Sequence, residues 1–408
     1  MIQLREYQKD LSAKALTILR HYKIVYLCMQ VRTGKTLTAL NVAQEYGAKK
    51  VLFITKKLAI KSIQADYEAL QPTFSITIIN NESLHKVTDN DFDLIISDEH
   101  HRLSAFPKPN RTTKDIKKRF SYLPMIFLSG TPAIESGSQW YHTFFVSYYT
   151  PFRQYANFYK FAKYFVNVKT KYLGAVKAND YSDAKMELID PIIAPYLVKF
   201  TQEEAGFKSV ISEQVLYCEM KPTTKAIADR LFSERILQGS KEVILADTPA
   251  KLLSKIHQIS NGTCIFESGN SAIIDDSKAL YIRDKFKGKK IAMFYFFQKE
   301  YELLKQVFGD ALTNDLNEFN TSDKCIALQQ IRGSEGISLK QAEALVYYSF
   351  GYAGRQYVQG RDRMTTIDRE ANKVYFVFSK GDINEKIYNV ISKKKRYNEK
   401  LFMRDYGR

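Results

Sequence analysis

The chain contains a series of short apolar runs that each end in small or polar residues. In the first half these runs cover residues 23–29, 49–55, 92–101 and 124–132, and segments with helical periodicity lie between them. Runs of this length are typical of strands that are buried on both faces of a parallel sheet. The alternation of strand and helix therefore predicts a doubly wound α/β lobe, in which ligands bind at the carboxyl ends of the strands.

The same pattern returns late in the chain and predicts a second α/β lobe. The apolar runs there are residues 289–297, 324–331, 343–350 and 373–379. A chain of 408 residues is also too long for one compact core and suits two domains. We expect an N-terminal lobe over residues 1–205 and a C-terminal lobe over residues 206–408.

The middle of the chain, roughly residues 137–285, has helical patterning and many aromatic residues. We expect helical insertions here, at about 137–200 in the first lobe and about 220–285 in the second. The aromatic residues are densest in 140–165. Such a stretch is either a base-stacking surface or buried core, and aromatic residues at helical spacing more often form core.

Composition predicts a globular protein without a membrane span. Hydrophobic residues make up 45% and charged residues 26%, and no apolar run approaches the length of about 18 residues that spans a bilayer. The first ten residues, MIQLREYQKD, lack the apolar region of a secretory signal, so we expect a cytoplasmic protein. The four cysteines lack the spacing of a zinc site or a disulfide framework and are expected to be buried thiols.

The formal net charge of +17 favours a polyanionic partner, because each neutralised phosphate releases condensed counterions. Nucleic acid is the polyanion that this charge suggests. A basic protein with no such partner has the same composition, so charge alone does not decide between them.

The triplet Gly34-Lys35-Thr36 follows an apolar run and precedes a helical pattern, which is the context of a phosphate-binding loop. Backbone N–H groups at the helix start would hold phosphate oxygens. Lys35 would neutralise the β- and γ-phosphates, and Thr36 would ligate magnesium. The P-loop pattern has glycine where this chain has Met29, and a triplet alone also occurs in ordinary exposed turns.

Two adjacent acids, Asp98 and Glu99, stand at the end of another apolar run. Asp98 would hold magnesium through water, and Glu99 would polarise the attacking water. A solvated turn at a strand end is the alternative. His100 and His101 follow, and adjacent residues leaving a strand point opposite ways, so structural or coupling roles are favoured over a metal site.

The order of these and further segments resembles that of superfamily-two helicases, specifically the Swi/Snf-type branch of DNA translocases, over nearly the whole chain. LREYQKD resembles the Q motif, MQVRTGKT motif I, LFITKKLAIKSIQADYE motif Ia, SDEHHRL motif II and LSGTPAIE motif III. IIAPYLVKFTQEE and KLLSKIHQISNG resemble segments between the lobes, KIAMFYFFQKEYELL motif IV, IRGSEGISLKQAEALVYYS motif V, QGRDR motif VI and SKGDINEKIYNVISKKK the C-terminal helix. This collinear order is more specific than any single motif.

The resemblance implies two RecA-like lobes with ATP and Mg²⁺ bound between them. It implies that Gln8 reads adenine and that the nucleotide is also bound by a wider set: Arg5, Thr33, Gly34, Lys35, Thr36 and Gly336. Thr36 and Asp98 would hold the metal. In this family the first P-loop position is commonly not glycine, so Met29 is no obstacle. The departure is Arg32, which replaces a usual glycine and must adopt a conformation that lets phosphate approach.

The resemblance also implies residues that couple ATP to movement. These are Ser129, Gly130 and Thr131 of motif III and Gln359 of motif VI. Motif VI is compressed in QGRDR, so Arg361 is the first choice and Arg363 the second for the arginine finger at the γ-phosphate, and the other arginine would form a local or interlobe ion pair.

Contacts to nucleic acid are expected mainly at phosphates and sugars, with little sequence preference. The candidates are Lys56, Gly333 and Ser334, and the basic stretch after motif II with Lys108, Arg111, Lys114, Lys117, Lys118 and Arg119. For the basic stretch, a solvated surface is the alternative.

The resemblance thus implies an ATP-dependent DNA translocase or helicase that acts on duplex or forked DNA, as in phage-type replication or recombination. Proteins of those processes are the further partners that it implies. No segment suits a histone-binding module, so a chromatin remodeller is disfavoured. An RNA helicase and a non-catalytic, ATP-gated DNA-binding subunit of a replisome remain alternatives.

Overall fold

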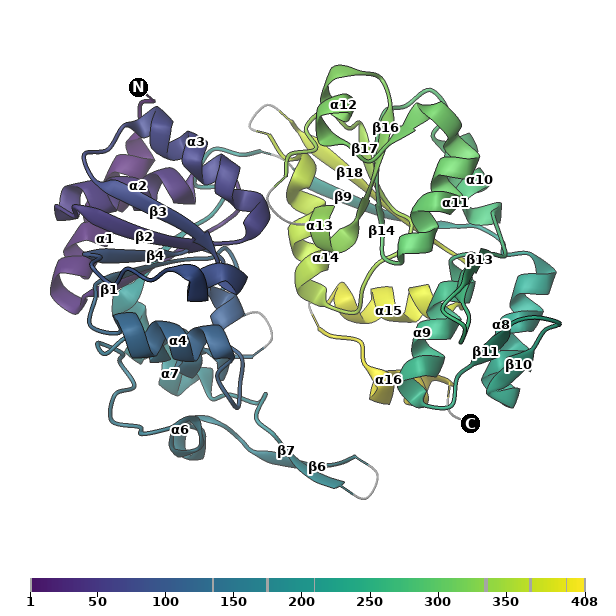
Figure 1. Ribbon diagram of the computed structural model, residues 1–408, viewed down its shortest axis with the longest axis horizontal. Helices are drawn as coiled ribbons and strands as arrows, with labels where there is room; N and C mark the ends of the chain where they lie inside the picture. Colours follow the sequence, from purple (N-terminus) through teal and green to yellow (C-terminus); the bar gives the residue numbers. More distant parts are fainter. Residues whose placement is uncertain are drawn as a thin grey trace. The chain divides into compact units, whose positions relative to one another are not determined.

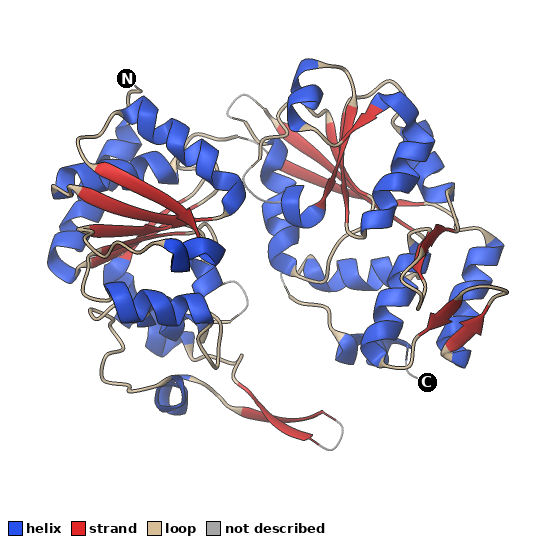
Figure 2. Ribbon diagram, in the orientation of Figure 1, coloured by secondary structure: helices blue, strands red, loops and turns tan. Residues whose placement is uncertain are grey.

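The chain divides into two compact units, each built around its own parallel sheet. The computed structural model describes residues 2–133, 136–173, 176–208, 210–333, 337–366, 369–393 and 395–406. The units are Met1–Gly206 and Phe207–Arg408, and each contains a six-stranded sheet with helices packed against it (Figures 1 and 2). Two α/β units with parallel sheets are therefore confirmed.

The sheet of the first unit has the strand order β3-β2-β4-β5-β1-β8, and neighbouring strands are parallel. Its strands are β1 (Ile24–Met29), β2 (Lys50–Thr55), β3 (Ser75–Asn80), β4 (Leu94–Ser97), β5 (Met125–Leu128) and β8 (Leu197–Phe200). The strands expected from the apolar runs are confirmed as β1, β2, β4 and β5. The two edge strands, β3 and β8, were not expected.

Helices cover both faces of this sheet, because right-handed crossovers in opposite directions along the sheet place their helices on opposite sides (Figure 1). One face carries α1 (Glu6–Tyr22), α2 (Lys35–Tyr46) and α3 (Ile60–Leu70), and the other carries α4 (Arg111–Phe120), α5 (Gln139–Phe145) and α7 (Met186–Ile193). The short 3-10 helices of this unit are η1 (Lys57–Ala59), η2 (Asn81–Lys86), η3 (His100–Leu103) and η4 (Ala194–Tyr196). The sheet is thus doubly wound.

The aromatic-rich stretch forms much of the core on the second face. Trp140, Phe144 and Phe161 are buried there in one cluster with residues of the sheet. The stretch also contains α6 (Phe158–Phe165) and precedes an antiparallel hairpin of β6 (Lys169–Leu173) and β7 (Val176–Asp180). The core interpretation is confirmed for most of these rings, and the insertion contains a hairpin besides its helices.

The sheet of the second unit has the order β15-β16-β14-β17-β18-β9 and is also parallel. Its strands are β9 (Val210–Tyr217), β14 (Ile291–Tyr295), β15 (Leu312–Thr313), β16 (Cys325–Gln329), β17 (Ala344–Tyr347) and β18 (Ala371–Phe378). The four late apolar runs are confirmed as β14, β16, β17 and β18. The edge strand β9 pairs with the whole of β18 and was not expected.

Helices lie on both sides of the second sheet, with α10 and α11 on one side and α13 and α14 on the other (Figure 1). The helices are α10 (Ser277–Lys285), α11 (Gln298–Phe308), α12 (Leu316–Thr321), α13 (Gln330–Gly333), α14 (Gly354–Arg361), α15 (Ile383–Ile391), α16 (Glu399–Tyr406), η5 (Gly309–Ala311) and η6 (Asp362–Met364). The insertion contains α8 (Pro222–Glu234), α9 (Pro249–Ser260) and two antiparallel pairs, β10 (Ile236–Gln238) with β11 (Val243–Leu245) and β12 (Thr263–Ile265) with β13 (Ser271–Ile273). This insertion, too, is not purely helical.

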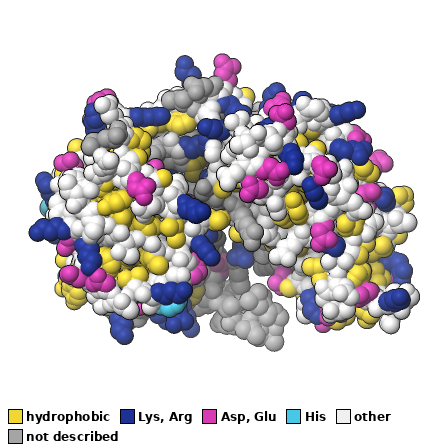
Figure 3. Space-filling model, turned by 45° about the horizontal axis from the view of Figure 1, so that its top comes forward, with side chains coloured by type: hydrophobic (Ala, Val, Ile, Leu, Met, Phe, Trp, Pro, Cys, Tyr) yellow, Lys and Arg dark blue, Asp and Glu magenta, His cyan; other side chains and the backbone are white. Residues whose placement is uncertain are grey.

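Charged side chains are spread widely over the surface. On the face drawn in Figure 3, Lys and Arg side chains lie over both units, with Asp and Glu among them. Among the described residues, no helix is long and apolar enough to cross a membrane. Cys218, Cys264 and Cys325 are buried, whereas Cys28 is half-buried, and all four are free thiols. A positive net charge spread in this way does not by itself locate a binding site.

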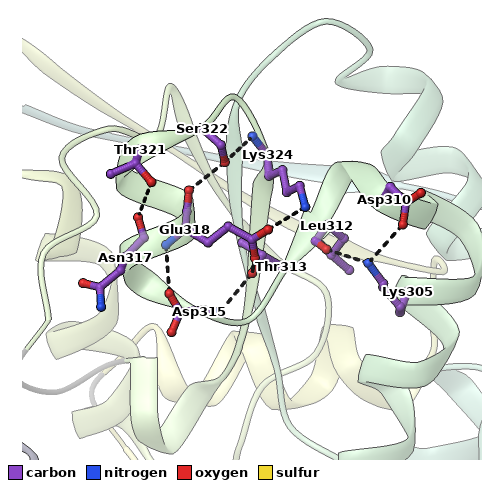
Figure 4. A network of polar contacts seen from close by, with 10 residues as sticks. All are labelled: Lys305, Asp310, Leu312, Thr313, Asp315, Asn317, Glu318, Thr321, Ser322 and Lys324. Atoms are coloured by element: carbon purple, nitrogen blue, oxygen red, sulfur yellow. Dashed lines mark hydrogen bonds and ion pairs between the residues drawn. The ribbon is translucent and has the colours of Figure 1, made fainter.

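The short edge strand β15 is held by side chains of the helix that follows it (Figure 4). Asp315 caps α12 by accepting a hydrogen bond from the backbone N–H of Glu318 at 2.8 Å. The Glu318 carboxylate accepts a hydrogen bond from the Thr313 hydroxyl and lies 2.5 Å from the Lys324 ammonium. These contacts join the strand, the helix and the start of β16, so a two-residue strand is enough to end the sheet.

Candidate functional site

The phosphate-loop candidate connects β1 to α2. Gly34 is the N-cap of α2 with φ 80°, and Arg32 has φ 65°, so both residues adopt the left-handed conformation. No side chain caps this helix, and its first turn contains no acid. Uncapped N–H groups and the helix dipole together favour an anion here. The strand-loop-helix context expected for Gly34, Lys35 and Thr36 is confirmed.

The segment that resembles the Q motif packs directly on this loop. Gln8 is buried, its Oε1 accepts a hydrogen bond from the Arg5 N–H at 2.9 Å, and its Nε2 would lie 2.0 Å from a Cβ added to Gly34. Tyr7 donates a hydrogen bond to the Thr33 carbonyl at 3.3 Å. Residues Arg5, Gln8, Thr33 and Gly34 are therefore brought together, and a side chain at position 34 would displace Gln8.

A second segment, from the end of the first unit, holds the other side of the loop. The backbone N–H of Gln202 donates to Gln30 Oε1 at 2.8 Å, and Gln202 Nε2 donates to the Val31 carbonyl at 2.9 Å. The Gln30 carbonyl accepts hydrogen bonds from Thr33 Oγ1 at 2.8 Å and Lys35 Nζ at 3.3 Å. Sequence reasoning gave Gln202 no role, and its only signal was its place two residues after β8.

We expect Arg32→Gly to stabilise the protein by up to about 1 kcal/mol. The left-handed conformation costs a non-glycine residue roughly 1–2 kcal/mol, and the greater entropy of glycine in the unfolded chain offsets part of the gain. Thermal unfolding of the variant and of Arg32→Ala would measure this effect, because alanine removes the side chain but keeps the backbone cost. A lower melting temperature for Arg32→Gly than for Arg32→Ala would contradict the strain argument.

Asp98 lies at the end of β4 and is fixed by its neighbour β2. Thr55 Oγ1 donates a hydrogen bond to Asp98 Oδ2 at 2.8 Å. Burial raises the pKa of Asp98, and the charge of Glu99 raises it further, while the ammonium groups of Lys35 and Lys56 act in the opposite direction. Lys35 and Asp98 follow strands of the same parallel sheet, and the charge of Lys35 acts on Asp98, so the phosphate loop lies near the acidic pair.

Glu99 connects the acidic pair to the end of β5. It has φ 47°, and its carboxylate lies 3.6 Å from Lys56 Nζ and 3.2 Å from His101 Nδ1. His101 Nδ1 is also 2.8 Å from Ser129 Oγ, which accepts a hydrogen bond from the Thr131 N–H at 3.0 Å. Ser129 and Thr131 are thus linked to the acid through His101.

Gly130 and Lys56 also lie close to the phosphate loop and the acidic pair. A Cβ at Gly130 would lie 3.2 Å from the Met29 carbonyl, so a larger residue would press on the strand that carries the loop. Lys56, expected among nucleic-acid contacts, has only 11% of its side chain exposed and pairs with Glu99. Sequence reasoning missed its place in the acidic site.

The two histidines have different partners, and they lie in the 3-10 helix η3, where a strand exit was expected. The His100 ring stacks on Phe127 with centroids 3.7 Å apart, and its nitrogens lie within 2.9 Å of Ser97 Oγ and 2.8 Å of the Thr143 carbonyl. Burial lowers the pKa of His100 to about 4, so the ring is neutral at pH 7. His100 is therefore a structural residue, and His101 is the one that contacts the acid.

In the second unit the two arginine candidates have different surroundings. Arg361 Nη1 lies 2.6 Å from Glu213 Oε1, and its guanidinium lies over the Tyr357 ring. Arg363 is 8% exposed and donates hydrogen bonds to the carbonyls of Gln359 at 3.0 Å and Ile337 at 3.4 Å. Arg363 thus donates hydrogen bonds to backbone carbonyls. The local ion pair, which was expected of the arginine that is not the finger, is formed by Arg361, the first choice for the finger.

The remaining nucleic-acid candidates fall into three groups. Lys108, Arg111, Lys114 and Lys118 are exposed on and before α4. Lys117 lies 3.4 Å from the centre of the Phe145 ring, and Arg119 pairs with Asp115 at 3.6 Å, so these two are engaged within the first unit. In motif V, Gly333 packs on Phe294, and a Cβ at this position would lie 2.3 Å from the ring. Ser334 and Gly336 lie outside the described residues.

No protein-family model matches this chain, and no curated protein matches it significantly. Its residues and their geometry are the grounds on which a function is assigned.

Proposed function

We propose that this protein is an ATP-dependent DNA translocase or helicase of the Swi/Snf-type branch of superfamily two, with two RecA-like lobes. The observation that best supports the proposal is the meeting of three strand ends in the first unit. The phosphate loop follows β1, Asp98 follows β4 and Ser129 follows β5, all at the carboxyl edge of one parallel sheet. Ligands of open α/β sheets bind at this edge.

The residues at this edge fit Mg²⁺ and ATP. An uncapped helix start with Lys35 suits the phosphates, and the half-buried carboxylate of Asp98 is an oxygen ligand of the kind that Mg²⁺ takes. Thr36 and Asp98 would hold the metal, which when bound neutralises charge on the phosphate oxygens. Gln8, packed against Gly34, would contact the base.

The chain's own residues then have separate tasks. Lys35 binds the β- and γ-phosphates, and Glu99 orients the attacking water and accepts its proton. His101 and Lys56 hold the Glu99 carboxylate from two sides. By the resemblance, Arg361 stabilises the charge on the γ-phosphate in the transition state, in which case it must leave Glu213.

The contact from Glu99 through His101 to Ser129 supports coupling between hydrolysis and movement. If Glu99 moves when the γ-phosphate is lost, its contact with His101 changes. His101 also contacts Ser129, which accepts a hydrogen bond from Thr131, so the turn from Ser129 to Thr131 is then held differently. The exposed basic residues of the α4 region are the proposed contacts to DNA phosphates, and replication or recombination is the proposed context.

The test is steady-state ATPase activity of the purified protein at fixed salt and Mg²⁺, alone and with duplex, single-stranded or forked DNA or with RNA. We expect at least about tenfold stimulation by DNA and little by RNA, because the proposal assigns the phosphate track to DNA. Stronger stimulation by RNA would establish the RNA-helicase alternative. Tight DNA binding without hydrolysis under any condition would leave the non-catalytic, ATP-gated subunit as the function.

A further inference from the structure

Helix α6 separates two kinds of aromatic residue. Phe158, Phe161 and Phe165 face the core of the first unit and are buried. Tyr159 and Tyr164 lie on the solvent side and are 48% and 56% exposed. Most rings of the aromatic-rich stretch are therefore explained by packing, but these two are not.

Two lysines lie between these tyrosines on the same side of the helix. Lys160 and Lys163 are exposed, and within the described ranges neither forms an ion pair. At 100° per residue, positions 159, 160, 163 and 164 fall within one face. We call Tyr159, Lys160, Lys163 and Tyr164 the α6 face.

The surroundings of the α6 face are basic. Residues 151–185 contain seven Lys or Arg and two Asp, and one of the lysines, Lys169, pairs with Asp183 at 2.6 Å. The hairpin β6–β7 follows α6 in the chain and projects away from it (Figure 1). The excess of positive charge fits a polyanion and disfavours a hydrophobic partner.

The two tyrosines lie at separate places on the helix, so that each can stack on a different base. Five helical positions correspond to about 7.5 Å along the axis and about 140° around it. A neighbouring ring supports each tyrosine from one side: Tyr181 lies 5.9 Å from Tyr159 and Tyr155 lies 5.6 Å from Tyr164, both between ring centres. The rings are held in place while about half of each side chain stays exposed.

We propose that the α6 face binds single-stranded nucleic acid, with the tyrosines stacked on bases and the lysines on the phosphates between them. A single strand is favoured over a duplex because the base faces of a duplex are covered by stacking, and rings on a convex helix do not reach them. This inference rests on the proposed function only in taking DNA as the partner. It adds a strand contact outside the ATP site.

The test is binding of a fluorescein-labelled oligothymidylate to the full chain, followed by anisotropy at several salt concentrations without nucleotide. Tyr159→Ala combined with Tyr164→Ala is expected to weaken binding at least tenfold, and the matching Phe substitutions to preserve it, because stacking needs the ring and not the hydroxyl. Lys160→Gln combined with Lys163→Gln is expected to make the salt dependence shallower by about 1.4 in log–log slope.

Tyr122→Ala is the matched control, since Tyr122 is 67% exposed on another part of the first unit. Wild-type affinity in the double Ala variant, or an equal loss in the Tyr122 control, overturns the proposal. The binding result is independent of hydrolysis. If the wild-type protein lacks ATPase activity but the double Ala variant loses strand binding, the proposed motor function is refuted and the proposal for the α6 face is supported. If the wild-type protein hydrolyses ATP but the double Ala variant binds the strand unchanged, the motor function is supported and the proposal for the α6 face is refuted.

Discussion

Lys35→Ala abolishes ATP hydrolysis, with an expected fall in kcat/KM of roughly a thousandfold or more. Lys35 is the first residue of α2, at a helix start that has no acid in its first turn, and its charge acts on Asp98. Alanine removes the cation that would bind the β- and γ-phosphates and leaves the loop backbone in place. The loss therefore appears both in nucleotide affinity and in turnover.

Steady-state ATPase and binding of a fluorescent ATP analogue would measure the two effects of Lys35→Ala separately. Lys57→Ala is the matched control, because Lys57 is an exposed lysine in η1 that follows another strand end of the same sheet. DNA binding is expected to persist in both variants. Wild-type turnover in Lys35→Ala would show that the phosphate loop does not serve ATP hydrolysis.

Glu99→Gln has the second large effect: ATP still binds, but turnover falls by about 10²–10⁴-fold. Glutamine keeps the size of the side chain and its contact with His101 but does not accept a proton from water. In the wild-type protein Lys56 Nζ lies 3.6 Å from a carboxylate oxygen of Glu99, and the variant removes this charged partner. The expected result is a protein that accumulates in its ATP-bound state and still binds DNA.

A single-turnover assay with pre-bound ATP isolates the chemical step in Glu99→Gln. Glu82→Gln is the control, since Glu82 is an exposed acid that follows the neighbouring strand β3. Full turnover in Glu99→Gln is incompatible with the role of general base.

The sequence was sufficient for the central strands of both sheets and failed at their edges. The central strands are unbroken apolar runs, whereas β3 is only partly buried and β8 contains the exposed Lys199. A strand at the edge of a sheet is less buried than a central strand, so fewer of its residues are apolar and its sequence pattern is weaker. The three-residue strands of the insertion in the second unit are too short for any periodicity to show.

The candidate site was predictable where residues are close in sequence. Gly34, Lys35, Asp98 and Glu99 follow from local motifs, but Gln202 reaches the loop from the far end of the unit. The different surroundings of Arg361 and Arg363 were also hidden, because Glu213, which pairs with Arg361, lies on a strand far away in the chain. Contacts between residues far apart in the chain are not indicated by the spacing of residues along the sequence.

The position of β8 has a consequence for the order in which the protein is made. This strand pairs with β1, and Gln202 just beyond it holds the phosphate loop, yet both are synthesised near the end of the first unit. Until the ribosome has released them, β1 has an open edge that can pair wrongly. The support of the phosphate loop by Gln202 therefore arises late in translation, long after the residues of the loop have left the ribosome.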